Sequence, residues 1–137
     1  MKKILLVDDE ATIRLVFSHI LSNENTAVIA CKNLREAKEA LLRHSFDLVI
    51  SDIRLSGING IEGLELLSYI KKETPGTEVI IMTAYGSEET REDAYRRGAF
   101  HFYEKPLDIN HLVSKIQALG INTSSTQSGL HKQYLNS

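Results

Sequence analysis

The stretch that decides the fold of this chain is ILLVDD at residues 4–9, a run of four apolar residues that ends directly in two carboxylates. Residues 48–52 repeat the arrangement as LVISD. Continuous apolar runs of this kind are typical of central strands in a parallel sheet, because helices cover both faces of such a sheet. We therefore expect these two stretches to form neighbouring strands in the middle of a parallel sheet.

Similar apolar runs recur along the chain and alternate with segments of helical period. The predicted strands are residues 3–7, 26–30, 47–51, 78–83 and 100–103. The predicted helices begin near Ile13, Asn33, Ile61, Ser87 and Asp108. This alternation is the pattern of repeated βαβ units, and it predicts an α/β fold with five strands and five helices.

The helix predicted over residues 87–97 differs from the others because it is almost entirely polar. It offers only Ala94 and Tyr95 to a core, whereas residues 13–21 and 109–119 each carry an apolar stripe. Two interpretations remain open for it. It is either an ordinary solvated helix or a helix that is free to move when a nearby site changes.

The composition excludes several classes of protein. The chain has 137 residues, of which 42% are hydrophobic and 25% charged, and this suits one soluble globular domain. No apolar stretch approaches the ~20 residues of a membrane span and no signal-peptide pattern is present, so we expect a cytoplasmic protein. The net charge of −2 gives no overall attraction to nucleic acid. The single cysteine, Cys31, excludes an internal disulfide.

The domain boundary is expected at Gly120. Residues 1–120 carry all the predicted strands and helices, while residues 121–137 are polar and rich in Ser and Thr near their start. Such a composition is typical of a flexible tail or an interdomain linker, and we expect nothing after Gly120 to enter the core.

Polar side chains stand where four of the predicted strands end. These residues are Asp8, Asp9, Asp52, Thr83 and Lys105. Because the carboxyl ends of parallel strands line one crevice, we expect three carboxylates, a hydroxyl and an amine to share one pocket. Each residue alone also has an ordinary explanation, such as a helix cap for the acidic pair or an exposed position for the lysine.

Together, these residues favour a metal site with phosphate chemistry. Crowded carboxylates repel one another unless a divalent cation neutralises them, and oxygen ligands suit Mg²⁺. A carboxylate beside such a cation can attack phosphorus, and a hydroxyl and an ammonium can then stabilise the phosphoryl oxygens.

Over residues 3–119 the sequence resembles the receiver domain of bacterial two-component response regulators. Asp8 and Asp9 look like the acidic pair that binds metal in this family, and Asp52 looks like its phosphoacceptor. Thr83 resembles the switch hydroxyl and Lys105 the invariant lysine, whose bond to the following proline the family often holds cis. The four motifs occur in order and at family-like separations.

Further residues take their expected roles from the same resemblance. The backbone carbonyl of Arg54 corresponds to a metal ligand, and the side chains of Arg54 and Tyr85 flank the acceptor pocket and influence how fast water reaches the phosphoryl group. Small Ala84 follows the switch hydroxyl. Phe102 corresponds to the switch aromatic, but it has no hydroxyl, so its rotation would depend on packing alone. Family members commonly carry proline where this chain has Ser56.

The resemblance implies a single-domain, flavodoxin-like, doubly wound sheet of five parallel strands in the order 2-1-3-4-5, with five helices. It implies that a sensor histidine kinase or a phosphotransfer protein supplies the phosphoryl group to Asp52, with Mg²⁺ or Mn²⁺ as cofactor. Such a domain is not a conventional enzyme, since it catalyses its own phosphorylation and a slow dephosphorylation. Because Arg54 and Tyr85 are both large, we expect a persistent phosphoprotein.

The output surface implied by the resemblance is formed by residues 87–97, 100–103 and 109–119. Phosphorylation would change how this face binds a downstream protein or a fused effector domain, or would promote a dimer through it. We expect neither nucleic acid nor a membrane to bind this chain directly.

Other classes of protein fit the sequence less well. A phosphatase of the haloacid dehalogenase kind also uses a strand-end aspartate, but it expects a second aspartate where this chain has Arg54, and it needs room for a cap domain. A flavodoxin-like nucleotide-binding module would need a glycine-rich loop, which residues 8–12 lack. A receiver-like interaction module that is never phosphorylated remains an alternative.

Overall fold

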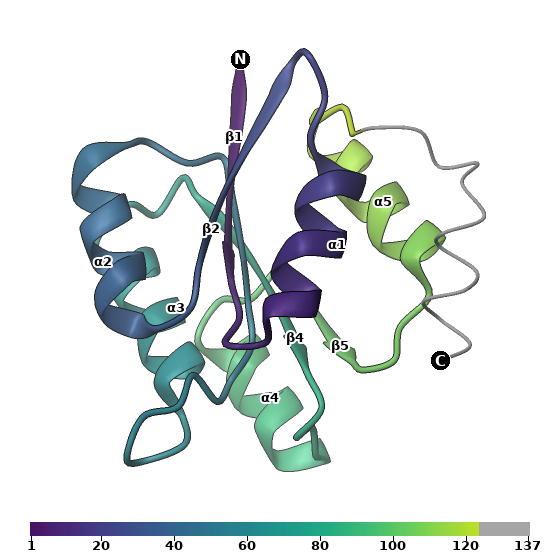
Figure 1. Ribbon diagram of the computed structural model, residues 1–137. Coiled ribbons are helices and arrows are strands. Elements are labelled where there is room, and N and C mark those ends of the chain that lie inside the picture. The colour runs from purple at the N-terminus through teal and green to yellow at the C-terminus, as the bar shows by residue number, and fades with distance from the viewer. Residues whose placement is uncertain (124–137) are drawn as a thin grey trace.

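The computed structural model describes residues 1–123 as five strands that alternate with five helices. The elements are β1 (Lys2–Val7), α1 (Ala11–Leu21), β2 (Thr26–Cys31), α2 (Leu34–Arg43), β3 (Leu48–Ser51), α3 (Glu62–Glu73), β4 (Glu78–Thr83), α4 (Glu88–Arg96), β5 (His101–Glu104) and α5 (Ile109–Ala118). All strand pairs are parallel, in the order β2-β1-β3-β4-β5 (Figure 1). The predicted fold class, strand order and central β1–β3 pair are confirmed.

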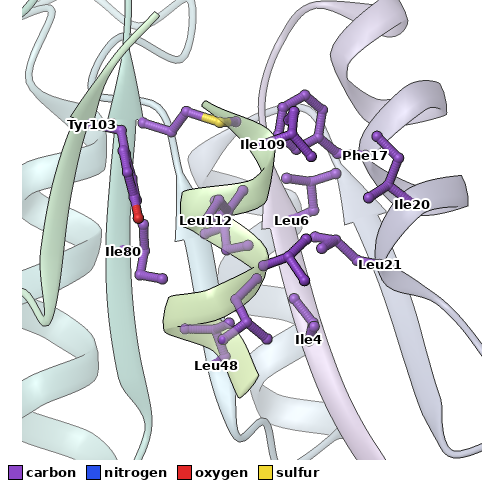
Figure 2. Packing of buried hydrophobic residues seen from close by; sticks show 14 of the residues in the cluster. Ile4, Leu6, Phe17, Ile20, Leu21, Leu48, Ile80, Tyr103, Ile109 and Leu112 are labelled. Atoms are coloured by element: carbon purple, nitrogen blue, oxygen red, sulfur yellow. The ribbon is translucent and has the colours of Figure 1, made fainter. Parts of the chain in front are cut away.

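Side chains of each strand alternate between two apolar cores, one on each face of the sheet. From β1, Ile4 and Leu6 enter the core beneath α1 and α5, while Leu5 and Val7 enter the core beneath α2, α3 and α4. Figure 2 shows the first of these cores, where side chains of α1 and α5 meet those of the sheet. Both faces are therefore covered, which explains why the β1 sequence is apolar without alternation.

Side-chain caps begin three of the helices. Asn33 accepts a hydrogen bond from the backbone N–H of Glu36, and Asp108 accepts one from the N–H of Asn110. The Ser87 hydroxyl caps α4 by accepting a hydrogen bond from the backbone N–H of Thr90. These starts agree with the sequence-based predictions.

Helix α4 contributes a single buried residue to the core. Ala94 is buried, whereas Tyr95, which the sequence also assigned to the core, is 36% exposed. The Tyr95 side chain lies over the edge of the sheet instead, where its hydroxyl accepts a hydrogen bond from the N–H of Phe102. The prediction that this polar helix gives Ala94 to the core is confirmed, but the prediction that Tyr95 joins it was wrong.

The folded region extends past the predicted boundary. Ile121 is 1% exposed and packs in the core beneath α1 and α5, and the carbonyl of Asn122 accepts a hydrogen bond from the Thr26 hydroxyl. Gly120 has a φ of 80°, which turns the chain back after α5 so that the next apolar residue meets the helix. The prediction that nothing after Gly120 enters the core was therefore wrong. The rest of the predicted tail, residues 124–137, lies outside the described residues.

The cysteine and the lengths of the helices also bear on the sequence-based predictions. Cys31 is buried at the end of β2 and is a free thiol. In the described part of the chain, no helix is long and apolar enough to cross a membrane.

Candidate functional site

The predicted site residues meet at the carboxyl edge of the sheet. Asp8 follows β1, Asp52 follows β3, Thr83 ends β4 and Lys105 follows β5. The backbone N–H of Lys105 donates to the carbonyl of Thr83 at 2.8 Å, which keeps these two residues side by side. The Lys105–Pro106 peptide bond is cis, as the resemblance implied. The convergence expected from the sequence is thus present in the structure.

Lys105 is the cation at the centre of the site. Its Nζ atom donates to Oδ2 of Asp8 at 2.8 Å and to Oδ2 of Asp52 at 3.0 Å, and lies 3.4 Å from Oε1 of Glu10. Burial alone would lower the pKa of Lys105, but the hydrogen bond to Asp8 and the charges of Asp52 and Asp8 raise that pKa above its usual value. The ammonium therefore stays protonated and neutralises part of the acidic cluster.

Two of the carboxylates are deeply buried. Asp8 is 0% exposed and Asp52 is 3% exposed. Burial raises the pKa of Asp8, and the hydrogen bonds that it accepts from Lys105 and from the N–H of Glu10 offset this rise only in part. Asp52 uses its other oxygen, Oδ1, to accept the N–H of Ile53 at 2.6 Å. Each buried carboxylate is thus held by one backbone N–H and by the shared ammonium.

The donor set fits a divalent cation. One carboxylate oxygen each from Asp8, Asp9, Glu10 and Asp52 can be chosen so that all lie within 4.8 Å of one another. Four carboxylates face the single charge of Lys105, so the cluster keeps a negative excess that a cation can neutralise. Oxygen donors of this kind suit Mg²⁺ or Mn²⁺. Glu10 was missed in the sequence analysis, although its place next to two aspartates was a signal for it.

A pocket of about 620 Å³ opens beside these carboxylates. Its lining comes from the β1–α1 turn, from the loop between β3 and α3, and from Tyr85 in the β4–α4 loop. The guanidinium of Arg54 lies 4.0 Å from the centre of the Tyr85 ring, a cation–π contact on the pocket wall. The structure therefore places Arg54 and Tyr85 on the pocket, as the resemblance predicted.

Comparison with known proteins identifies the family. The family model of the response regulator receiver domain matches residues 4–117, which is most of the chain. The chain belongs to this family. The resemblance drawn from the strand-end residues is therefore confirmed.

Two curated relatives of this receiver domain are longer regulators. It is 40% identical over 111 residues to the response regulator protein PilR of Pseudomonas aeruginosa, and 37% identical over 112 residues to the DNA-binding transcriptional regulator NtrC of Escherichia coli. These alignments cover 81% and 82% of this chain but only 24% and 23% of the relatives. The chain thus spans about a quarter of the length of the curated relatives that it matches.

Solved structures of receiver domains have the same fold. A CheY-like receiver domain protein from Methanospirillum hungatei is 30% identical with a TM-score of 0.79, and the match covers 88% of this chain and 94% of that one. The beryllofluoride-activated NtrC4 receiver domain dimer is 32% identical with a TM-score of 0.77, covering 87% and 96%. Receiver domains of two-component systems generally act as phosphorylation-dependent switches, use Mg²⁺ and are not conventional enzymes.

The residues expected to act as the switch lie at the end of β4 and in β5. The hydroxyl of Thr83 accepts a hydrogen bond from the N–H of Tyr85 at 3.1 Å, and Ala84 between them is exposed. Phe102 is 3% exposed and packs in the core beneath α2, α3 and α4. The aromatic ring is therefore inside in this structure.

The loop after Asp52 is held by a residue of α3 that sequence reasoning missed. Glu62, at the start of α3, is 6% exposed and accepts backbone N–H groups from Leu55 at 3.2 Å and from Gly60 at 3.0 Å. Burial would raise the pKa of Glu62, but these backbone hydrogen bonds lower it below the usual value. A glutamate in the first turn of a helix normally indicates only a favourable helix dipole, so the sequence carried no specific signal for this contact.

Proposed function

We propose that this receiver domain accepts a phosphoryl group on Asp52 and acts as a phosphorylation-dependent switch. The observation that supports the proposal most directly is the environment of Asp52. Asp52 is 3% exposed, yet it lines the open pocket and accepts a hydrogen bond from the partly buried ammonium of Lys105. A phosphoryl donor can therefore reach Asp52 from the pocket, while competing solvent contact is small.

The proposed chemistry is transfer from a phosphohistidine, presented by a sensor histidine kinase or a phosphotransfer protein. An oxygen of Asp52 forms a bond to phosphorus as the bond between phosphorus and the imidazole nitrogen breaks, and the imidazole leaves with its electron pair. Lys105 already lies 3.0 Å from Asp52, so its ammonium is in place to donate a hydrogen bond to a phosphoryl oxygen.

Asp8, Asp9 and Asp52, together with the carbonyl of Arg54, would hold Mg²⁺ or Mn²⁺ during this reaction. The cation would supply charge neutralisation for the phosphoryl oxygens in the transition state. Without it, the negative excess of the four-carboxylate cluster would repel the incoming donor.

The proposed switch runs through Thr83 and α4. To donate to a phosphoryl oxygen on Asp52, the Thr83 hydroxyl moves toward Asp52, and this movement lengthens the hydrogen bond that it now accepts from the N–H of Tyr85. Tyr85 lies two residues before Ser87, which caps α4, and α4 buries only Ala94. Rotation of buried Phe102 would accompany the movement through packing alone.

The output would be a change in the face formed by α4, β5 and α5. That change would alter binding to a downstream protein or a fused effector domain, or would favour a dimer through this face. The dimer of the similar, beryllofluoride-activated NtrC4 receiver domain supports the second outcome. Because PilR and NtrC are much longer, we propose that residues 1–123, which include buried Ile121, act as the receiver of a cytoplasmic two-component pathway and that the predicted tail or linker follows them.

The test is beryllofluoride, a phosphoryl mimic, added with Mg²⁺ to the wild-type chain and to Asp52→Asn. Backbone amide chemical shifts are the readout. In the wild type we expect shifts around Asp52, Thr83 and α4, and in the variant none of these. Unchanged wild-type shifts would instead favour a receiver-like module that phosphorylation does not regulate. Equal shifts in both proteins would exclude Asp52 as the acceptor.

A further inference from the structure

The carboxylate of Asp9 is held from the opposite side of the pocket by Ser56. The hydroxyl of Ser56 donates to Oδ2 of Asp9 at 2.6 Å, across 47 positions of sequence. This contact differs from those of Asp8 and Asp52, which are held by Lys105 and by backbone N–H groups. Within residues 1–123, Ser56 is the side chain that hydrogen-bonds to Asp9. The bond joins the β1–α1 turn to the loop between β3 and α3.

The backbone of Ser56 is in a conformation that side chains rarely adopt. Its φ is 62°, and within the described chain it is the one non-glycine residue with a positive φ. For an ordinary residue this left-handed conformation costs ~1–2 kcal/mol, and glycine would adopt it more easily. Proline, with φ fixed near −65°, could not follow the same path. A serine at this position therefore bears a backbone cost that its hydroxyl contact helps to offset.

The flanking loop is fixed independently of Ser56. The buried carboxylate of Glu62 accepts the N–H of Leu55 on one side and the N–H of Gly60 on the other. Its Oε2 atom would lie 2.1 Å from a Cβ atom added to Gly57, so the loop wraps closely around this carboxylate. The position of Ser56 relative to Asp9 is therefore set by the loop, and the hydroxyl is presented from a backbone that is already ordered.

We propose that Ser56 is a positioning residue for the divalent cation, acting through Asp9. The inference rests on the proposed metal site. Asp9 is exposed, and without a partner its carboxylate would sample several rotamers, which cation binding would have to restrict. The short, charge-assisted bond from Ser56 restricts them beforehand, in the position where the Asp9 oxygens lie within reach of Asp8 and Asp52.

Mg²⁺ titrations of the full chain, followed by amide chemical shifts, test the proposal without any phosphoryl transfer. Two variants remove the hydroxyl in different ways: Ser56→Ala keeps the strained backbone, and Ser56→Gly relaxes it. We expect both to bind Mg²⁺ about three- to tenfold more weakly than the wild type, an effect below the ~10- to 100-fold typical of outer-shell partners because this bond is exposed. Ser114→Ala, which removes an exposed hydroxyl on α5, is the matched control and should leave the affinity unchanged.

Thermal unfolding in chelator separates positioning from folding. Ser56→Gly should be at least as stable as the wild type while binding Mg²⁺ more weakly, a combination that a purely structural role does not produce. An affinity of Ser56→Gly within twofold of the wild type, or above it, would overturn the proposal, since Ser56 would then be neutral or would compete with the cation. If the wild type itself shows no Mg²⁺-dependent shifts at Asp8, Asp9 or Asp52, the metal site fails, and this inference fails with it.

Discussion

Replacing Lys105 with methionine removes the ammonium that contacts Asp8, Glu10 and Asp52 while keeping most of the length and apolar surface of the side chain. The Asp8 and Asp52 side chains are 0% and 4% exposed, and that of Lys105 is 11% exposed, so water cannot easily replace the lost ammonium. The contact with Glu10 matters less, because that carboxylate is 58% exposed.

The expected loss of stability depends on the cation. Leaving a buried charge without its partner costs ~3–5 kcal/mol, and we expect Lys105→Met to lose about this much in the free energy of unfolding when the solution contains EDTA. Mg²⁺ can replace the ammonium as the neutralising charge. Bound at a hundred times its dissociation constant, a ligand adds ~2.7 kcal/mol of stability. The variant should bind Mg²⁺ more tightly than the wild type, because the competing ammonium is gone, so its deficit should shrink in Mg²⁺.

Urea unfolding followed by far-ultraviolet circular dichroism, in EDTA and in saturating Mg²⁺, measures both quantities. Lys72→Met, at an exposed position of α3, controls for the loss of one positive charge. The reasoning is refuted if Lys105→Met is as stable as the wild type in EDTA, or if its deficit is the same in both solutions. The first result would mean that Lys105 does not neutralise the cluster, and the second that Lys105 and the cation do not compete for it.

Two further predictions concern lifetime and pH. The cation–π contact between Arg54 and Tyr85 should slow hydrolysis of the phosphoryl group on Asp52, so the phosphorylated wild type should persist for minutes or longer. Arg54→Ala or Tyr85→Ala should release phosphate about fivefold faster, the equivalent of ~1 kcal/mol. Loss of the wild-type phosphoryl group within seconds would contradict this. Burial and neighbouring positive charges lower the pKa of His101 below its usual 6.5, so the unfolded state binds a proton first as pH falls. Stability should therefore fall below pH 6.5, and His101→Gln should flatten urea midpoints between pH 7 and 5.

The place of the site residues was predictable because it depends on topology more than on packing. Asp8, Asp52, Thr83 and Lys105 each end or follow an apolar run, and parallel strands must bring such positions to one edge. Two periodicities, one for strands and one for helices, were enough to recognise the runs. The convergence of these residues therefore followed from the sequence before any distance was known.

What the sequence did not contain are contacts made by loops. The left-handed backbone of Ser56 depends on how Glu62 binds the N–H groups of the loop, and neither residue type signals that geometry. Ile121 was excluded from the core because polar residues surround it, although the turn at Gly120 carries it back onto α5. Tyr95 was assigned to the core because the polar helix offered only this residue and Ala94, but it is 36% exposed. In each case the position of the residue depends on the tertiary course of the backbone, which local sequence does not determine.

The way in which α4 is held suits the proposed switch. Only Ala94 is buried in this helix, so few apolar contacts resist its displacement. Hydrogen bonds contribute at its two ends: the N–H of Thr90 donates to the Ser87 hydroxyl, and the hydroxyl of Tyr95 accepts the N–H of Phe102 in β5. Such bonds are worth ~0.5–1.5 kcal/mol each. The Thr83 hydroxyl accepts a hydrogen bond from the N–H of Tyr85, just ahead of the cap, and movement of that hydroxyl to donate to a phosphoryl oxygen on Asp52 would pull on this segment. Because these energies are small, a change of charge at one buried carboxylate can shift the equilibrium between two positions of α4.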